Sequence, residues 1–129
     1  MCRALARATM GGVPVTVLIV DDFAAFRRSA RALLEDDGFD VVGEAADGRT
    51  ALAAVERLRP AVVLLDVQLP DEDGFEVAAR VASGPDPPVV VLVSTRDAGA
   101  YAPRLAATPA RGFIAKAELS GERLAALLE

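Results

Sequence analysis

Five short apolar segments recur along the chain, separated by segments with helical periodicity. The apolar segments are rich in β-branched residues, and three of them are hydrophobic almost throughout instead of alternating with polar positions. Strands of a parallel sheet that is covered on both faces have this pattern. We therefore expect strands at Val15–Val20, Val41–Val42, Ala61–Leu65, Val89–Val93 and Gly112–Ala115.

Apolar residues at helical spacing fill the intervals between these strands. The first interval places four of them on one face of a helix and three arginines on the other, and similar stripes follow the second and fifth strands. Successive strand–helix units favour right-handed crossovers and an open parallel sheet with helices on both faces. We therefore expect a doubly wound α/β fold whose ligands bind at the carboxyl ends of the strands.

Composition limits the chemistry that this fold can carry. The 129 residues include no histidine, one cysteine, and 19 acidic against 14 basic side chains, for a net charge of −5. A chain of this length forms one domain, and without histidine it has no Ser-His-Asp triad, no imidazole zinc ligand and no phosphohistidine. The acidic charge argues against direct binding of nucleic acid.

The apolar stretches also bear on the boundaries and location of the domain. They are far shorter than the roughly 20 residues that cross a bilayer, so we expect no membrane segment. We interpret residues 1–13 as a loose N-terminal extension and 14–129 as the domain, with no output domain attached. Cys2 cannot form an internal disulfide, which fits a reducing compartment and a cytoplasmic location.

Acidic side chains stand at the ends of two of the expected strands. Asp21 and Asp22 follow the first strand and Asp66 follows the third, so three carboxylates gather at one edge of the sheet if these strands are neighbours. Their mutual repulsion would be relieved by a hard divalent cation with oxygen ligands, and Mg²⁺ fits this set best.

An amine and a hydroxyl reach the same edge of the sheet. Lys116 follows the fifth strand, and Ser94 and Thr95 follow the fourth. A metal and a lysine neutralise phosphate oxygens, and a hydroxyl donates to one of them, so the whole set suits phosphoryl transfer to a carboxylate.

The segment from Asp66 to Gly74, with proline four residues and glycine eight residues after the aspartate, resembles the phosphoacceptor loop of response-regulator receiver domains. With Asp21–Asp22 after the first strand and Lys116 after the fifth, the resemblance covers residues 14–129. It implies a flavodoxin-like fold of five strand–helix units, a role in two-component signal transduction, and Mg²⁺ as cofactor.

The resemblance also implies a role for each matching residue. Asp66 would accept the phosphoryl group, and Lys116 would pair with one of its oxygens. Ser94, 22 residues before the lysine, would be the switch hydroxyl, with the adjacent Thr95 as the alternative. Phe113 would be the aromatic residue that moves inward with that hydroxyl. Gln68 and Arg96 occupy positions that adjust hydrolysis of the acyl phosphate, and the metal ligands would be Asp21, Asp22, Asp66 and the backbone carbonyl of Gln68.

Each of these residues also has an ordinary structural interpretation. Asp22 could cap the first helix, since aspartate is among the preferred N-cap residues. Taken singly, Lys116 would be a solvated surface residue, Phe113 a core residue and Ser94 a loop hydroxyl. Their joint position at the strand ends is what favours a common site.

Three departures from the family pattern lie in the last third of the chain. Ala117 replaces the usual proline after the lysine, so we expect a trans Lys116–Ala117 bond, because a cis bond before alanine costs about 2.5–4 kcal/mol. Pro103 predicts a short fourth helix that begins near Ala102, and Pro109 excludes a left-handed cap at its end. These changes weigh against dimerisation through this face.

Three functions are compatible with the sequence. In the leading hypothesis a histidine kinase or phosphotransfer protein phosphorylates Asp66, and the surface of the fourth strand, the following helix and the fifth strand then changes its binding to a downstream protein. The chain would then be no enzyme beyond its own phosphorylation and dephosphorylation. The alternatives are a degenerate, phosphorylation-independent interaction module and an aspartyl-phosphate hydrolase of the haloacid-dehalogenase type.

Overall fold

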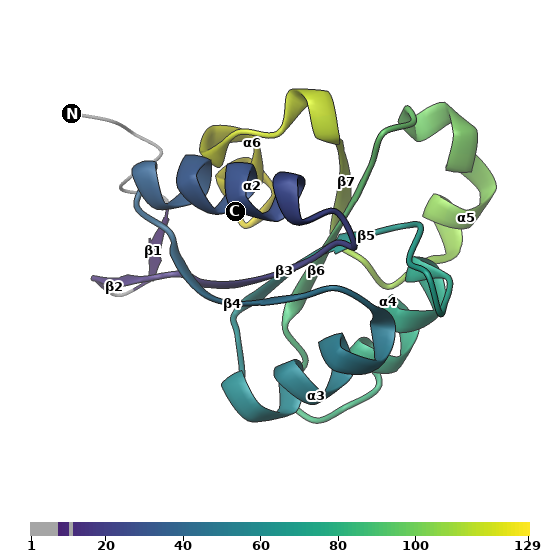
Figure 1. Ribbon diagram of the computed structural model, residues 1–129, viewed down its shortest axis with the longest axis horizontal. Helices are drawn as coiled ribbons and strands as arrows, with labels where there is room; N and C mark the ends of the chain where they lie inside the picture. Colours follow the sequence, from purple (N-terminus) through teal and green to yellow (C-terminus); the bar gives the residue numbers. More distant parts are fainter. Residues whose placement is uncertain (1–7, 11) are drawn as a thin grey trace.

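Five parallel strands form the central sheet of the computed structural model, which describes residues 8–10 and 12–129 (Figure 1). Their spatial order is β4-β3-β5-β6-β7, so the order reverses between β3 and β5. This arrangement confirms the predicted doubly wound, flavodoxin-like α/β fold. The strands are β3 (Thr16–Val20), β4 (Asp40–Ala45), β5 (Val62–Asp66), β6 (Val89–Ser94) and β7 (Gly112–Ala115).

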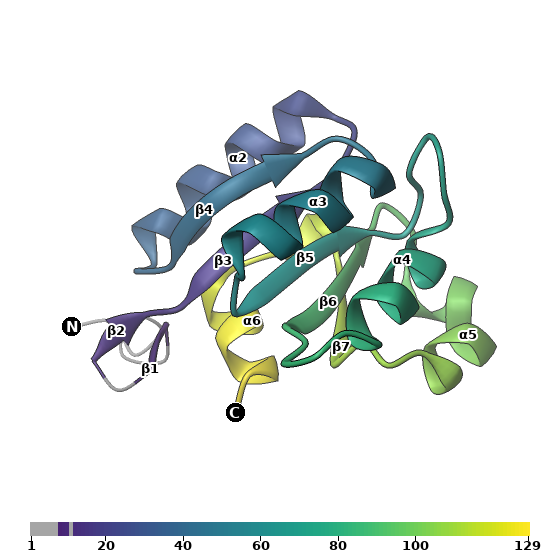
Figure 2. The same cartoon turned by 90° about the horizontal axis from the view of Figure 1, so that it is seen from below.

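Helices cover both faces of the sheet. The helices α2 and α6 lie on one face and α3 and α4 on the other, with α5 beside α4 (Figure 2). Two short 3₁₀ segments, η1 before α5 and η2 after β7, complete the connections. The bounds are α2 (Ala24–Asp36), α3 (Gly48–Leu58), α4 (Gly74–Ala82), η1 (Ala98–Tyr101), α5 (Ala102–Ala107), η2 (Lys116–Glu118) and α6 (Gly121–Leu127).

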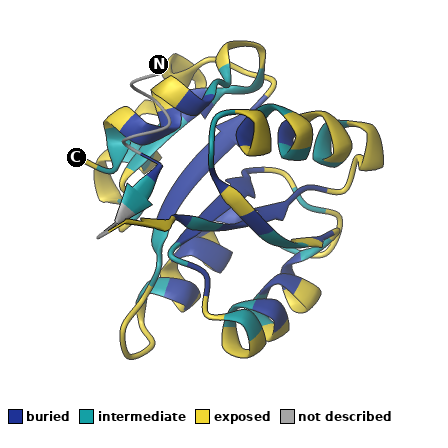
Figure 3. Ribbon diagram, turned by 90° about the vertical axis from the view of Figure 1, so that its left-hand side faces the viewer, coloured by how far each residue is buried: buried dark blue, intermediate teal, exposed yellow. Residues whose placement is uncertain are grey.

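The sheet separates two hydrophobic cores. Alternate residues of each strand point to opposite faces, so Ile19 and Leu64 pack with α2 and α6, while Leu18 and Leu65 pack with α3 and α4. The central strands β3, β5 and β6 are buried except for the first residues of β3 and β6, and the exposed positions lie mainly on the outer sides of the helices and in the loops (Figure 3). Because both faces of these strands are buried, their sequences are continuous apolar runs and do not alternate with polar residues.

Side-chain caps define the ends of several helices. Ser120 accepts a hydrogen bond from the N–H of Arg123 at 3.0 Å and is the N-cap of α6, a position that serine favours. The α2 helix ends at Asp37, and Gly38 follows with a φ of +95°, a conformation that glycine adopts without strain. Asp37 also accepts the N–H of Gly121 at 3.0 Å, which ties the end of α2 to the start of α6.

The departures in the last third of the chain have the expected structural effects. The α5 helix is six residues long and begins at Ala102, with Pro103 in its first turn. It ends at Thr108, whose backbone is extended with a φ of −81°, so no left-handed cap is used before Pro109. The Lys116–Ala117 peptide bond is trans.

A small hairpin precedes the sheet. Strands β1 (Thr9–Met10) and β2 (Val13–Pro14) pair antiparallel, and Ala8 is buried against the core, where its carbonyl accepts the N–H of Val15 at 2.6 Å. The rest of the expected N-terminal extension, residues 1–7 and 11, lies outside the described residues. Among the helices that are described, none has the length and hydropathy of a membrane span.

Candidate functional site

Three carboxylates meet at the point where the strand order reverses. Asp21 directly follows β3 and Asp66 ends β5, and the two strands pair in register up to Val20 and Leu65. Carboxylate oxygens of Asp21, Asp22 and Asp66 all lie within 4.8 Å of one another. Asp21 and Asp66 are buried, whereas Asp22 is exposed at the rim.

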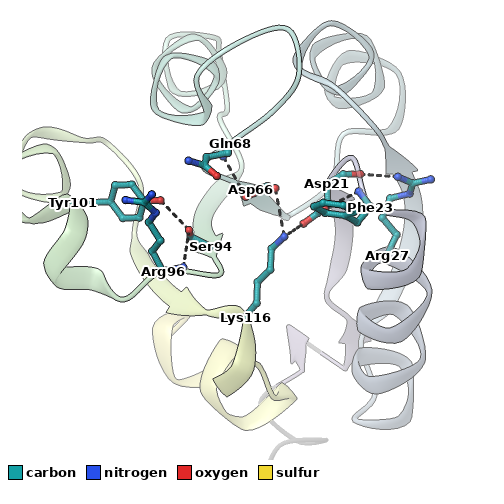
Figure 4. Close-up of polar contacts among 9 residues, drawn as sticks. All are labelled: Asp21, Phe23, Arg27, Asp66, Gln68, Ser94, Arg96, Tyr101 and Lys116. Carbon is teal, nitrogen blue, oxygen red and sulfur yellow. Dashed lines mark hydrogen bonds and ion pairs between the residues drawn. The ribbon is translucent and has the colours of Figure 1, made fainter.

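The ammonium of Lys116 lies between the two buried carboxylates (Figure 4). Its Nζ is 2.5 Å from Asp21 Oδ2 and 3.4 Å from Asp66 Oδ2. Two aromatic rings of the β3–α2 segment also face it, since Nζ is 4.5 Å from the ring centroid of Phe26 and 5.6 Å from that of Phe23. Ion pairing and cation–π contact together hold this long side chain over the site.

Burial and charge raise the proton affinity of the Asp66 carboxyl. Loss of hydration raises the pKa of Asp66 to about 6, and the neighbouring Asp21 charge adds to the effect. The hydrogen bond from the Gln68 N–H to Asp66 Oδ1, at 3.2 Å, and the Lys116 charge act in the opposite direction. At neutral pH Asp66 is therefore a carboxylate whose negative charge is incompletely compensated.

The donor set fits a hard divalent cation. Asp21 Oδ2 is buried and, within the described part of the chain, forms no hydrogen bond of acceptable geometry, although the Lys116 ammonium is close to it. A buried, incompletely satisfied carboxylate oxygen beside two further carboxylates is the oxygen environment that Mg²⁺ prefers.

Tight packing fixes the loop that follows Asp66. A Cβ at Gly74 would lie 2.7 Å from Val67 Cα and closer still to the Asp66 carbonyl oxygen, so glycine is required here. The N–H of Gly74 donates to the Val67 carbonyl at 2.7 Å. Asp73 caps α4 by accepting the N–H of Phe75 at 2.8 Å, so the loop is joined directly to the helix.

A second anchor joins this loop to α3. Asp71 accepts the backbone N–H groups of Gly48 at 2.9 Å and Arg49 at 3.1 Å, at the start of that helix. These bonds lower the pKa of the Asp71 carboxyl. The loop that follows Asp66 is thus tied to the starts of both α3 and α4.

The two candidate hydroxyls differ in position. Ser94 is buried at the end of β6, and its Oγ lies 2.9 Å from the Tyr101 hydroxyl and accepts the Arg96 N–H at 3.1 Å. Thr95 is exposed and lines the pocket of about 280 Å³ that also contains Asp66 and Lys116. The Ser94 hydroxyl therefore points away from Asp66 in this structure (Figure 4).

Phe113 packs against Tyr101. It is half-buried on β7, and its ring centroid is 5.9 Å from that of Tyr101. Tyr101 is the main residue of this region that the sequence analysis missed. Its position seven residues after Ser94, as a tyrosine in an otherwise polar and alanine-rich segment, is the signal that was available.

The start of α2 does not use Asp22 as its N-cap, which was one interpretation of that residue from the sequence. Phe23, not Asp22, occupies the N-cap position, and its N–H donates to Asp21 Oδ1 at 2.9 Å. The capping interpretation of Asp22 was therefore wrong. Arg27, also unpredicted, donates to the Asp21 carbonyl at 2.6 Å and fixes the backbone at this corner.

A larger cleft lies at the other end of the sheet. It has a volume of about 710 Å³ and lies between α3 and α4, with the Pro85–Pro88 segment along one side. None of the carboxylates described above lines it, so size alone does not identify the site.

Comparison with known proteins identifies the class to which this fold and site belong. Residues 17–129 match the response regulator receiver domain. The chain therefore belongs to the response regulator receiver domain family, in which aspartate phosphorylation and Mg²⁺ binding at an acidic pocket are general features. This membership sets aside the haloacid-dehalogenase-type alternative.

Individual relatives agree with this assignment. A putative transcriptional regulator of Pseudomonas aeruginosa is 40% identical over 110 residues, which cover 85% of this chain and 53% of that protein. The transcriptional regulatory protein PdtaR of Mycobacterium tuberculosis is 38% identical over 99 residues, covering 70% of this chain and 48% of that protein. The chain spans about half the length of these relatives.

Solved structures show the same fold. The receiver domain of the putative response regulator NarL from Mycobacterium tuberculosis is 36% identical, with a TM-score of 0.76 over 88% of this chain and 96% of that chain. A CheX–CheY complex with BeF₃ and Mg²⁺ from Borrelia burgdorferi gives a TM-score of 0.82 over 96% of this chain and 95% of that chain. At 23% identity, the latter supports the fold alone.

Proposed function

We propose that this receiver domain accepts a phosphoryl group on Asp66 and changes its binding to a downstream protein as a result. The observation that carries the proposal is the placement of a buried carboxylate beside Lys116 and Asp21, at adjacent strand ends. A surface aspartate would need none of these neighbours. An acceptor needs them, because a phosphoryl group adds charge that only nearby cations can offset.

The proposed donor is a histidine kinase or a phosphotransfer protein, as for other receiver domains, and its phosphohistidine lies outside these 129 residues, which contain no histidine. An oxygen of the Asp66 carboxylate attacks phosphorus, and the O–P bond forms as the phosphorus–nitrogen bond of the donor breaks. The bonding electrons leave with the donor imidazole, which takes up a proton from solvent. Hydrolysis by water later regenerates the carboxylate and releases inorganic phosphate.

Each neighbouring residue has a defined task in this step. Lys116 pairs with a phosphoryl oxygen, and the Ser94 hydroxyl donates to another once it has rotated toward Asp66. Asp21, Asp22, Asp66 and the backbone carbonyl of Gln68 hold Mg²⁺, which supplies positive charge to the transferred group when bound. Gln68 and Arg96, both exposed at the rim, adjust the access of water to the acyl phosphate.

Phosphorylation of Asp66 is proposed to change partner binding at the surface formed by β6, η1, α5 and β7. Ser94 ends β6 and Phe113 lies on β7, so a change in the Ser94 hydroxyl acts on this surface first. The downstream partner is a protein, in line with the negative charge of the chain, and the site of action is the cytoplasm.

Intact-mass spectrometry tests the assignment. Wild type, Asp66→Ala and the exposed control Asp97→Asn are incubated with Mg²⁺ and acetyl phosphate. We expect wild type and Asp97→Asn to gain the mass of one phosphoryl group and Asp66→Ala to gain none. Equal modification of all three proteins, or of none, contradicts the proposal, and the second result favours a phosphorylation-independent interaction module.

A further inference from the structure

The hydroxyl of Ser94 is paired with that of Tyr101, a residue that has no role in the phosphoryl transfer proposed above. Ser94 Oγ and Tyr101 Oη are 2.9 Å apart, and the exposed fractions of the two residues are 1% and 9%. The pair joins the end of β6 to the end of η1, as the close-up of the site shows (Figure 4).

This pair determines where the serine hydroxyl points. A serine hydroxyl has one proton to donate and two lone pairs that accept. The Arg96 N–H already donates to Oγ at 3.1 Å, and Tyr101 takes a second position around the same atom. A phosphoryl oxygen on Asp66 accepts only, so Ser94 reaches it by rotating its hydroxyl away from Tyr101.

Aromatic packing fixes Tyr101 beside the serine. Its ring lies between two others, with centroids 5.8 Å from Phe75 at the start of α4 and 5.9 Å from Phe113 on β7. Both contacts are tilted, at 56° and 51°, which is a favourable geometry for aromatic pairs. The ring therefore occupies the space next to Phe113 for as long as its hydroxyl stays bonded to Ser94.

The same tyrosine anchors a short and weakly held segment. Tyr101 is the last residue of η1 and the N-cap of α5, a helix of only six residues in which no residue is buried. The other prominent anchor is Arg104, which pairs with Asp73 at 2.6 Å and lies 4.2 Å over the Phe75 ring. After release of Tyr101, the segment Ala98–Ala107 is held mainly by the Arg104 contacts and by the partly buried Leu105, which packs against the core.

We propose that Tyr101 is a positioning residue that holds the Ser94 hydroxyl away from Asp66 in the unphosphorylated protein. Recruitment of Ser94 to the phosphoryl group breaks the pair, frees the Tyr101 ring and loosens Ala98–Ala107. The proposal rests on the proposed function, since it concerns the response of this segment to a phosphoryl group on Asp66.

The sequence provides a direct reporter for this event. Tyr101 is the only tyrosine and the chain has no tryptophan, so tyrosine fluorescence reports on Tyr101 alone. The full chain is treated with Mg²⁺ and acetyl phosphate while fluorescence and intact mass are recorded on the same sample. We expect the fluorescence change to follow the phosphorylated fraction, and Ser94→Ala to produce a similar change without the phosphodonor.

The two proposals fail in different ways in this experiment. Full phosphorylation with unchanged Tyr101 fluorescence overturns the role of Tyr101 and leaves the acceptor assignment intact. Absence of the mass gain overturns the acceptor assignment, and the role of Tyr101 with it. A Ser94→Ala protein with the wild-type fluorescence also contradicts the proposal, because the hydroxyl pair would then not affect the ring.

A second measurement separates positioning from simple packing. Tyr101→Phe keeps the ring and removes the hydroxyl, so Ser94 no longer has to leave a partner. We expect it to bind beryllofluoride, a phosphoryl mimic, about two- to tenfold more tightly than wild type in the presence of Mg²⁺, measured by calorimetry. A merely structural role would lower stability without raising this affinity.

The Ser94→Ala background completes the test. There, Tyr101→Phe should leave beryllofluoride affinity unchanged, because the two effects act through one hydroxyl pair. Equal affinities of wild type and Tyr101→Phe, or the same gain with and without Ser94, overturn the proposal. If Tyr101→Phe fails to fold, the fluorescence of the wild-type protein still decides the question.

Discussion

Lys116 and Asp21 form a buried ion pair, with 2.5 Å between Nζ and Oδ2, although the strands they follow, β7 and β3, are separated in the sheet by β5 and β6. The exposed fractions of the two side chains are 10% and 0%. The same ammonium also faces Asp66 at 3.4 Å, so one cation offsets two buried carboxylates. Removal of this cation should therefore affect stability before any phosphoryl group is present.

Lys116→Met should lower the free energy of unfolding by about 3 kcal/mol, because it leaves uncompensated charge in a buried site. Urea unfolding with and without Mg²⁺ measures the effect, and Mg²⁺ should stabilise the variant more than the wild type. Arg123→Ala is the control, since its pair with Glu118 is more than half exposed and is worth at most about 0.5 kcal/mol. Equal losses in both variants would contradict the buried-charge explanation.

Asp66→Asn should raise stability at neutral pH in the absence of Mg²⁺, by about 1–2 kcal/mol, because it removes a desolvated charge beside Asp21. Chemical denaturation at pH 7 measures the change. Asp22→Asn, at the exposed rim, should alter stability by less than about 0.5 kcal/mol and yet weaken the response to Mg²⁺. An Asp66→Asn protein that is less stable than wild type would be the contrary result.

Gly74→Ala should destabilise the protein by about 2–4 kcal/mol, because its Cβ would overlap the backbone of Asp66 and Val67. Under the proposed function the variant should also lose phosphorylation by acetyl phosphate, since the backbone of Asp66 has to shift. Gly84→Ala, just beyond the other end of α4, meets its nearest atom at 3.8 Å and should stay within about 0.5 kcal/mol of wild type. Urea unfolding of both variants measures these losses. Similar losses in the two variants would show that the overlap at Gly74 is not the cause.

Glu44→Gln should lower stability at pH 7 by about 0.5–1 kcal/mol. The Arg31 guanidinium, at 2.8 Å, and Arg27, at 3.0 Å, lower the pKa of the Glu44 carboxyl in the folded state. A lowered folded-state pKa adds stability above the unfolded-state pKa, and this contribution is lost as pH falls below it. The difference between wild type and variant should therefore shrink at about pH 3, and a difference independent of pH would contradict the ion-pair explanation.

Ser94→Ala should weaken beryllofluoride binding about tenfold or more, because a hydrogen bond to a charged phosphoryl mimic is stronger than one to a neutral group. Thr95→Ala should change the affinity less, although Thr95 lines the pocket in the present structure. Calorimetry on the two variants distinguishes the candidates, and a larger loss in Thr95→Ala would transfer the switch role to that residue.

Most of the fold could be predicted from the sequence, because strands buried on both faces leave continuous apolar runs such as Val89–Val93. The β4 strand was the least well predicted. It extends over Asp40–Ala45, beyond the Val41–Val42 pair, because an edge strand with polar positions has a weaker pattern. The short α5 helix followed from Pro103, since proline restricts where a helix begins.

The carboxylates and Lys116 were predicted to meet because each stands at a strand end, and the structure brings them together. Their roles in phosphoryl transfer stay predictions. Contacts that join distant segments through single side chains left no periodic signal. The Arg104–Asp73 pair, which spans 31 residues, belongs to this class, and the Tyr101–Ser94 pair, seven residues apart across a loop and a 3₁₀ segment, was equally invisible to periodicity. Their partners are set by how the helices pack on the sheet.

The separation of the two hydrophobic cores has a consequence for how this domain tolerates sequence change. Ala30 and Leu124 belong to one core, Ala78 and Tyr101 to the other, and the sheet lies between them. A substitution on one side is therefore absorbed by repacking that need not cross the sheet. The surface over α2 and α6 and the surface over α3 to α5 are thus free to diverge independently, each constrained mainly by the partners it meets.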